Sequence, residues 1–176
     1  MGPTEINGIP AHPLLVHFVV VLVPLTALAL PACALWPSVM RRLGLSLPVL
    51  ALVTLVAVPL TTHAGEWLAE RVNENAQLER HTEMGDGLLP WGVGLFVMAT
   101  ALWWTYVRVG TPSTPEANGL VATSRKRATL VRIAAVLLSL VVAVGAIVHV
   151  YRIGDSGAKA TWGAGEPTLP VARMSA

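Results

Sequence analysis

Histidine is the residue type in this sequence best suited to chemistry. The five histidines are His12, His17, His63, His81 and His149. One nitrogen of a neutral imidazole binds heme iron, zinc or copper, and the other nitrogen is usually held by a hydrogen bond. The histidines are therefore candidate ligands. What they bind depends on which of them the fold brings together.

Carboxylates accompany two of these histidines. Glu66 and Glu70 follow His63 at spacings of three and seven residues, which places the three side chains on one face of a helix. Residues 79–86 contain three more carboxylates around His81. Imidazole and carboxylate groups together are ligands of zinc and copper. Because no spacing matches a strong metal motif such as H-E-x-x-H, a solvated polar rim explains the same glutamates equally well.

The composition indicates which elements must position these side chains. Of the 176 residues, 54% are apolar and only 12% are charged, whereas soluble domains have about 25% charged residues. Four apolar runs have the roughly 20 residues that a helix needs to cross a bilayer. They are residues 14–36, 45–64, 88–107 and 128–150. The sequence therefore predicts an integral membrane protein, with the lipid bilayer as its surroundings and no nucleic-acid partner.

The four spans predict an all-α fold, an antiparallel bundle of four transmembrane helices. Short connections make sequential helices neighbours, and lipid requires the backbone hydrogen bonds to be made within each helix. We expect an N-terminal segment at residues 1–13, the four-helix domain at 14–152 and a partly ordered C-terminal tail at 153–176. Residues 110–124, which contain two prolines, are expected to form a flexible connection.

Charge predicts the orientation of the bundle. The two connections on one side, with the helix ends beside them, carry seven basic residues and one acidic residue. The other side holds both termini and the second connection, with five basic and nine acidic residues. By the positive-inside rule the first side is cytoplasmic. The sequence therefore predicts a multi-pass protein of the cytoplasmic (inner) membrane, with both termini outside.

All five histidines fall on the outer side in this topology, and each of the four helices contributes at least one. His17 lies about one helical turn inside the apolar boundary, and His149 lies in the last apolar turn, where an unpaired polar ring is costly. His12 is expected to cap the first helix in contact with water. Arg152 lies just beyond the fourth span on the same side.

Two glycines suggest a flat ligand. Gly145 lies four residues before His149 and Gly85 lies four residues after His81, so each imidazole is expected to have open space on its own helix face. A b-type heme held by two histidines needs such space and two opposed imidazoles. The predicted cofactor-binding residues are His17, His63, His81 and His149, with Gly85 and Gly145. Glycines also let helices pack closely in lipid, and this alternative stays open.

Four segments of the sequence resemble a bacterial family of predicted four-helix membrane proteins, domain-of-unknown-function family 2231. They are Asn7 to Phe18 (NGIPAHPLLVHF), Thr62 to Glu66 (THAGE), Glu79 to Asp86 (ERHTEMGD) and Ile153 to Ala160 (IGDSGAKA). The resemblance covers nearly the whole chain. It implies similarity to four-helix b-type cytochromes and favours electron transfer, with His17 and His81 as the better ligand candidates. Asp155 stands where some relatives are expected to have a histidine.

The resulting hypothesis is a heme b-binding electron-transfer component with its site near the outer face, meeting a respiratory or redox partner protein there. We expect an electron-transfer or accessory protein rather than a stand-alone enzyme, and no catalytic residues are assigned. Two alternatives stay open. One is a cofactor-free accessory or scaffold subunit of a membrane complex. The other is a copper or zinc protein that uses His17, His81 and Glu66.

Overall fold

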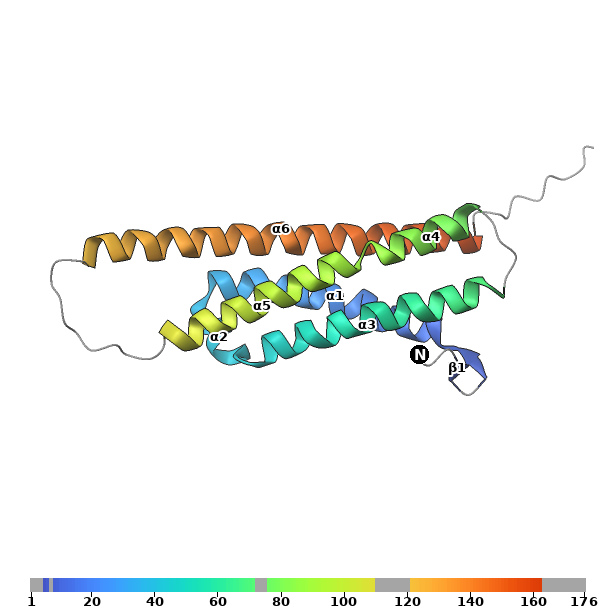
Figure 1. Ribbon diagram of the computed structural model, residues 1–176, viewed down its shortest axis with the longest axis horizontal. Helices are drawn as coiled ribbons and strands as arrows, with labels where there is room; N and C mark the ends of the chain where they lie inside the picture. Colours follow the sequence, from blue (N-terminus) through green and yellow to red (C-terminus); the bar gives the residue numbers. More distant parts are fainter. Residues whose placement is uncertain (1–4, 7, 72–75, 110–120, 163–176) are drawn as a thin grey trace, which may run out of the picture.

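The structure is a computed structural model that describes residues 5–6, 8–71, 76–109 and 121–162 (Figure 1). A short antiparallel strand pair, β1 (Glu5–Ile6) and β2 (Ile9–Pro10), comes before the helices. The helices are α1 (Ala11–Leu35), α2 (Pro37–Leu43), α3 (Ser46–Ala69), α4 (Ala76–Asp86), α5 (Leu89–Val109) and α6 (Val121–Trp162). The predicted all-α fold is confirmed.

Four stretches are long and apolar enough to cross a membrane. They are Ala11–Leu35, Ser46–Ala69, Leu78–Arg108 and Thr129–Lys159. Each predicted span lies largely within one of them, because a run of about 20 apolar residues is stable in hydrocarbon only as a helix with its own hydrogen bonds. The molecule is therefore a multi-pass membrane protein.

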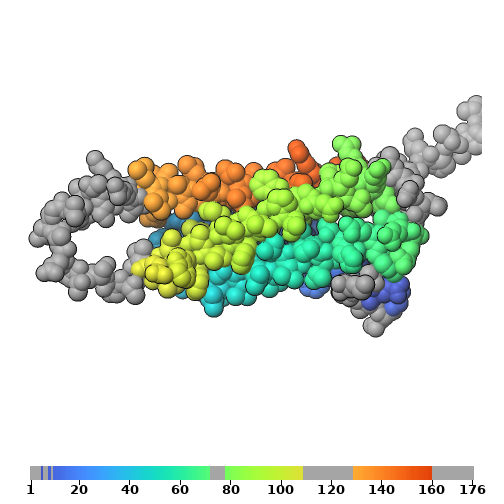
Figure 2. All heavy atoms as spheres, viewed as in Figure 1, coloured from blue at the N-terminus to red at the C-terminus, as the bar shows by residue number. Residues whose placement is uncertain are grey.

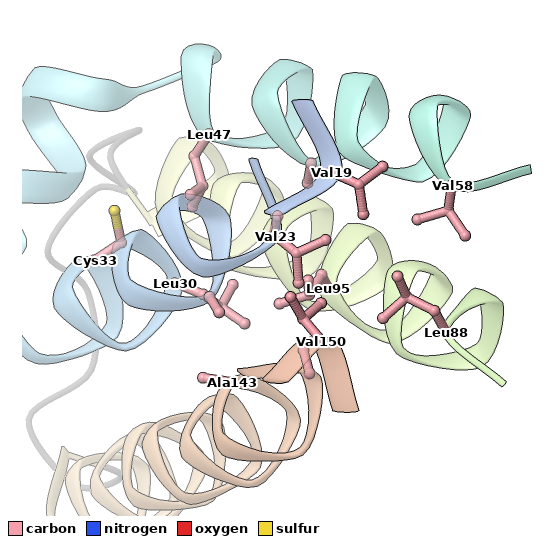
Figure 3. Packing of buried hydrophobic residues seen from close by; sticks show 14 of the residues in the cluster. Val19, Val23, Leu30, Cys33, Leu47, Val58, Leu88, Leu95, Ala143 and Val150 are labelled. Atoms are coloured by element: carbon pink, nitrogen blue, oxygen red, sulfur yellow. The ribbon is translucent and has the colours of Figure 1, made fainter. Parts of the chain in front are cut away.

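The helices pack as a closed bundle. α1 lies against α3 and α6, α3 packs on α5, and α6 runs beside α4 and α5 along the face seen in Figure 2. Val23, Leu95 and Val150 come from three different helices and meet in the core (Figure 3). Apolar residues on the opposite faces are exposed, such as Val21 and Leu130, as expected for a surface that faces lipid chains.

The bundle has two chemically different ends. The end that we call the histidine end contains the start of α1, the end of α3, helix α4 and the end of α6, and it holds all five histidines. The opposite end, the arginine end, contains α2, the end of α5 and the start of α6. Arg41 and Arg42 lie in the last turn of α2, and Arg108 lies in the last turn of α5.

Helix α4 was not predicted, because residues 76–86 are too polar for a membrane span. Its uncharged residues Leu78, His81, Thr82 and Gly85 nevertheless recur at the spacing of one helical face, and all four line the cavity described below. The opposite face carries exposed charged residues. This amphipathic pattern of four positions is the signal that would have predicted the helix.

Helix α6 is longer than the span predicted at residues 128–150. Residues 121–124 were expected in a flexible connection and residues 153–162 in a partly ordered tail, yet both are helical. At the histidine end of this helix, Ile153 packs against the core and Ser156 bonds to α4, and these contacts hold the additional turns in place. The rest of both segments, residues 110–120 and 163–176, lies outside the described residues.

Candidate functional site: a cavity lined by histidines

A cavity of about 520 Å³ lies inside the histidine end, between α1, α3, α4 and α6. Its size falls within the roughly 300–1,000 Å³ of small-molecule and cofactor sites, and such sites combine an apolar lining with a few placed polar groups. Most of its lining is apolar, with Val16, Val19 and Val58 among the side chains. Three of the five histidines also line it: His12, His17 and His81.

Two of these histidines have the same tautomer. His12 Nδ1 lies 3.0 Å from the carbonyl oxygen of Thr61, and His17 Nδ1 lies 2.5 Å from that of Pro13. A carbonyl oxygen only accepts, so each Nδ1 must carry the hydrogen and donate it. Each Nε2 therefore keeps a lone pair, which is the state of an imidazole that can bind a metal or accept a hydrogen bond.

His81 has the same tautomer for a different reason. Its Nδ1 lies 3.0 Å from Oγ of Ser156, and that hydroxyl donates its single hydrogen to the carbonyl of Ile153 at 2.8 Å. The hydroxyl can then only accept from His81, so the hydrogen is on Nδ1 and the lone pair is on Nε2. All three imidazoles of the cavity are thus held through Nδ1 and keep a basic Nε2.

His12 and His81 form a close pair across the cavity. Their ring centroids are 6.3 Å apart, and the ring planes are nearly perpendicular, at 84°. His12 comes from α1 and is bonded to α3, while His81 comes from α4 and is bonded to α6. The pair therefore lies where four helices meet. The expectation that His12 is a solvated helix cap is wrong, because its half-buried ring turns inward toward α3.

Glycines on the neighbouring helices make room for both rings. A Cβ atom at Gly65 would lie 2.8 Å from Cε1 of His12, and one at Gly157 would lie 3.0 Å from Cε1 of His81. Side chains do not fit at such distances. The sequence pattern pointed to Gly85 and Gly145 instead, because it compares residues along one helix. Gly65 and Gly157 lie on different helices from the histidines that they contact.

The two remaining histidines lie outside the cavity. His149 packs on Gly87, and its Nε2 lies 2.9 Å from the carbonyl oxygen of Met84, so it ties α6 to the junction of α4 and α5. His63 is about half exposed and pairs with Glu66 at 3.8 Å. The structure therefore does not bring these two predicted ligands to the site.

The two glycines predicted to border a flat ligand differ. Gly85 lines the cavity, and a Cβ there would meet Thr62 at 3.5 Å, an ordinary van der Waals contact. The expected open space beside Gly145 is absent. A Cβ there would lie 2.0 Å from the indole of Trp91, which fills the position. Gly145 thus serves the packing of α5 on α6.

The predicted zinc or copper set is not assembled. Glu66 lines the cavity with His17 and His81. Within the described ranges, however, no three histidine, cysteine or acidic side chains are close enough to hold a metal ion together. Arg152 is exposed on α6 and does not line the cavity.

These features define a membrane-embedded four-helix protein with an imidazole-lined cavity at one end. The chain belongs to the family described as "Predicted membrane protein (DUF2231)", which matches residues 8–168. The resemblance found in the four sequence segments is thereby confirmed over most of the chain. Comparison with curated proteins and with solved structures found no match.

Proposed function

We propose that this protein is a heme b-binding electron-transfer component of the bacterial cytoplasmic membrane, with His12 and His81 as the heme ligands. The observation that carries the proposal is the His12–His81 pair, in which both Nδ1 atoms are engaged and both Nε2 atoms keep lone pairs. His81 was among the predicted ligands. His12 replaces His17, which the sequence pattern favoured as the second ligand.

The spacing of the two rings fits one metal centre between them. At a metal–nitrogen distance of about 2 Å, a shared metal holds two imidazole nitrogens about 4 Å apart. Each ring centroid lies behind its nitrogen, so a centroid separation of 6.3 Å leaves room for this arrangement. The adjoining cavity, which Gly85 lines without a side chain, suits the flat macrocycle.

The chain's own residues would tune such a group. The hydrogen bonds to Thr61 and Ser156 fix the orientation and the tautomer of both rings. Most of the cavity lining is apolar, and the polarity and solvent exposure around a heme are among the factors that set its potential. When bound, heme supplies one-electron transfer at its iron.

The placement of the histidines favours electron exchange at one face. The five histidines all lie at the histidine end, so the arginine end has none that could hold a second heme. A chain of two hemes across the membrane is therefore not expected. Electrons would leave through a redox partner protein at the face of the histidine end, which we predict to be the outer face.

The test is the absorption spectrum of the purified full-length protein after dithionite reduction. We expect split α and β bands in the wild type, their loss in His12→Ala and His81→Ala, and their retention in His63→Ala, the exposed control. Because His17 is not a member of the pair, His17→Ala should also keep the heme.

Two results would reject the proposal. The first is a wild type that has no heme even when heme is supplied during expression. The second is full heme content in both ligand variants. Metal analysis of the same samples separates the alternatives, since bound copper or zinc supports a metal protein and the absence of any cofactor supports an accessory or scaffold subunit.

A further inference from the structure

We propose that the deeper part of the same cavity binds a neutral, membrane-soluble hydroquinone between His17 and Asp86. This goes beyond the proposed function, because binding of the hydroquinone does not require heme. It rests on the positions of polar groups along the cavity and on two acceptors that have no hydrogen-bond partner among the described residues. It also rests on the absence of lysine and arginine among the described residues that line the cavity.

The cavity has two layers of polar groups. α1 and α4 both run from the histidine end toward the centre of the bundle. His17 follows His12 by five residues and Asp86 follows His81 by five residues, so each lies about 7 Å deeper along its helix at about 1.5 Å per residue. Both line the cavity. The same two helices therefore carry His17 and Asp86 farther from the histidine end than His12 and His81.

Both deeper residues are exposed and carry acceptors that have no hydrogen-bond partner among the described residues. The hydrogen of His17 is donated from Nδ1 to Pro13, which leaves the Nε2 lone pair. In the described part of the chain, no hydrogen bond or ion pair involves His17 Nε2 or the carboxylate of Asp86. A ligand with two O–H donors at opposite ends of a rigid ring, as in a para-hydroquinone, could donate to one acceptor on α1 and one on α4.

The charge of the lining selects against other lipids. Glu66 and Asp86 line the cavity, and no lysine or arginine is among the described residues that do so. The phosphate of a phospholipid would therefore meet carboxylates without a balancing cation. An acyl chain alone would leave both acceptors without donors. A neutral donor ligand avoids both costs.

The cavity is open at the side of the bundle. Val20 lines the cavity on α1 and is 46% exposed within an apolar stretch long enough to span a membrane. His17, one turn before it on the same helix, is also exposed. A hydroquinone with a hydrocarbon tail could thus enter from the bilayer and leave its tail among lipid chains.

The test is isothermal titration of the full-length protein in detergent, under nitrogen, with 2-decyl-1,4-benzohydroquinone and with its dimethyl ether. The ether has the same ring and tail but no O–H donors. We expect the ether to bind at least about tenfold more weakly, as the loss of hydrogen bonds predicts. His17→Phe and Asp86→Leu should each weaken hydroquinone binding about tenfold, and His63→Phe should leave it unchanged.

Equal affinity for the two probes would overturn the proposal, since the cavity would then recognise only an apolar chain. No saturable binding of either probe would overturn it too. If the variants fail to fold, the comparison of the two probes on the wild type still decides. Discrimination without heme would reject only the proposed function, and heme without discrimination would reject only the hydroquinone site.

Discussion

At the scale of single residues, the site depends on glycines that lie opposite histidines. The ring of His12 occupies the position that a side chain at residue 65 would need, and the ring of His81 does the same at residue 157. In both pairs the glycine is on another helix, so the fit of the ring depends on the tertiary structure. Each imidazole also donates a hydrogen bond from Nδ1 to a residue of another helix. These hydrogen bonds link the helices and also fix the tautomer of each ring.

Gly65→Ala should lower the free energy of unfolding by about 1–3 kcal/mol, the usual cost of overpacking a tight site. The new methyl group would lie 2.8 Å from the His12 ring and would displace its bond to Thr61. Gly154→Ala is the matched control on α6. It meets no atom within 4 Å, so it should stabilise the protein by about 0.5–1 kcal/mol through helix propensity alone. Unfolding in SDS followed by circular dichroism measures both, and changes of the same sign would contradict this account.

At the scale of the elements, α4 and the outer turns of α6 build one wall of the cavity. α4 continues the line of α5 beyond the apolar span (Figure 1). Its polar face is in contact with water, and its inner face presents His81 and Gly85 to the cavity. The bond from His81 to Ser156 attaches this amphipathic helix to α6, so a polar segment becomes a fixed part of the site.

Farther into the bundle, α5 and α6 are held in register by the fit of Trp91 on Gly145. Gly145→Ala should therefore destabilise the protein by about 1–3 kcal/mol through overpacking. In a Trp91→Leu background the same substitution should be neutral or stabilising by up to about 1 kcal/mol, because the indole is gone and alanine is the better helix former. The two backgrounds form a double-mutant cycle, measured by the same SDS unfolding. An equal cost of Gly145→Ala in both would show that Trp91 is not the reason for the glycine.

At the scale of the whole molecule, the two ends of the bundle differ in charge and in chemistry. Arg41, Arg42 and Arg108 gather at the arginine end, where Arg132 also donates to the terminal carbonyl of α1 at Leu35. The histidines and most carboxylates lie at the opposite end. This polarity favours one insertion direction, because basic residues beside membrane spans are retained in the cytoplasm.

Both termini should therefore lie outside the cytoplasm. Fusions of alkaline phosphatase and of green fluorescent protein to the C-terminus test this in cells, because the first is active only outside and the second fluoresces only inside. We expect phosphatase activity without fluorescence. The opposite pattern would invert the topology and move the cavity to the cytoplasmic face, where its redox partner would have to lie.

From the sequence alone we could predict the class of fold, the approximate spans and the grouping of the histidines at one end. These follow from local properties, since the transfer of an apolar run into lipid depends on its composition and length. Successive spans run in alternating directions, so the order of the spans also indicates at which end of the bundle each residue lies. The four segments that resemble the family were likewise recognisable from the sequence, without any knowledge of how the helices pack.

Only the tertiary structure decided which histidines meet. His12 and His17 are both near the start of α1, and the sequence favoured His17, yet His12 faces His81. The choice depends on how α1 is rotated against its neighbours and on the presence of Gly65 opposite the ring. The same holds for Gly145, whose open space is filled by a tryptophan 54 residues earlier in the chain. Such fits involve pairs of residues on different helices, and a pattern along one helix does not contain them.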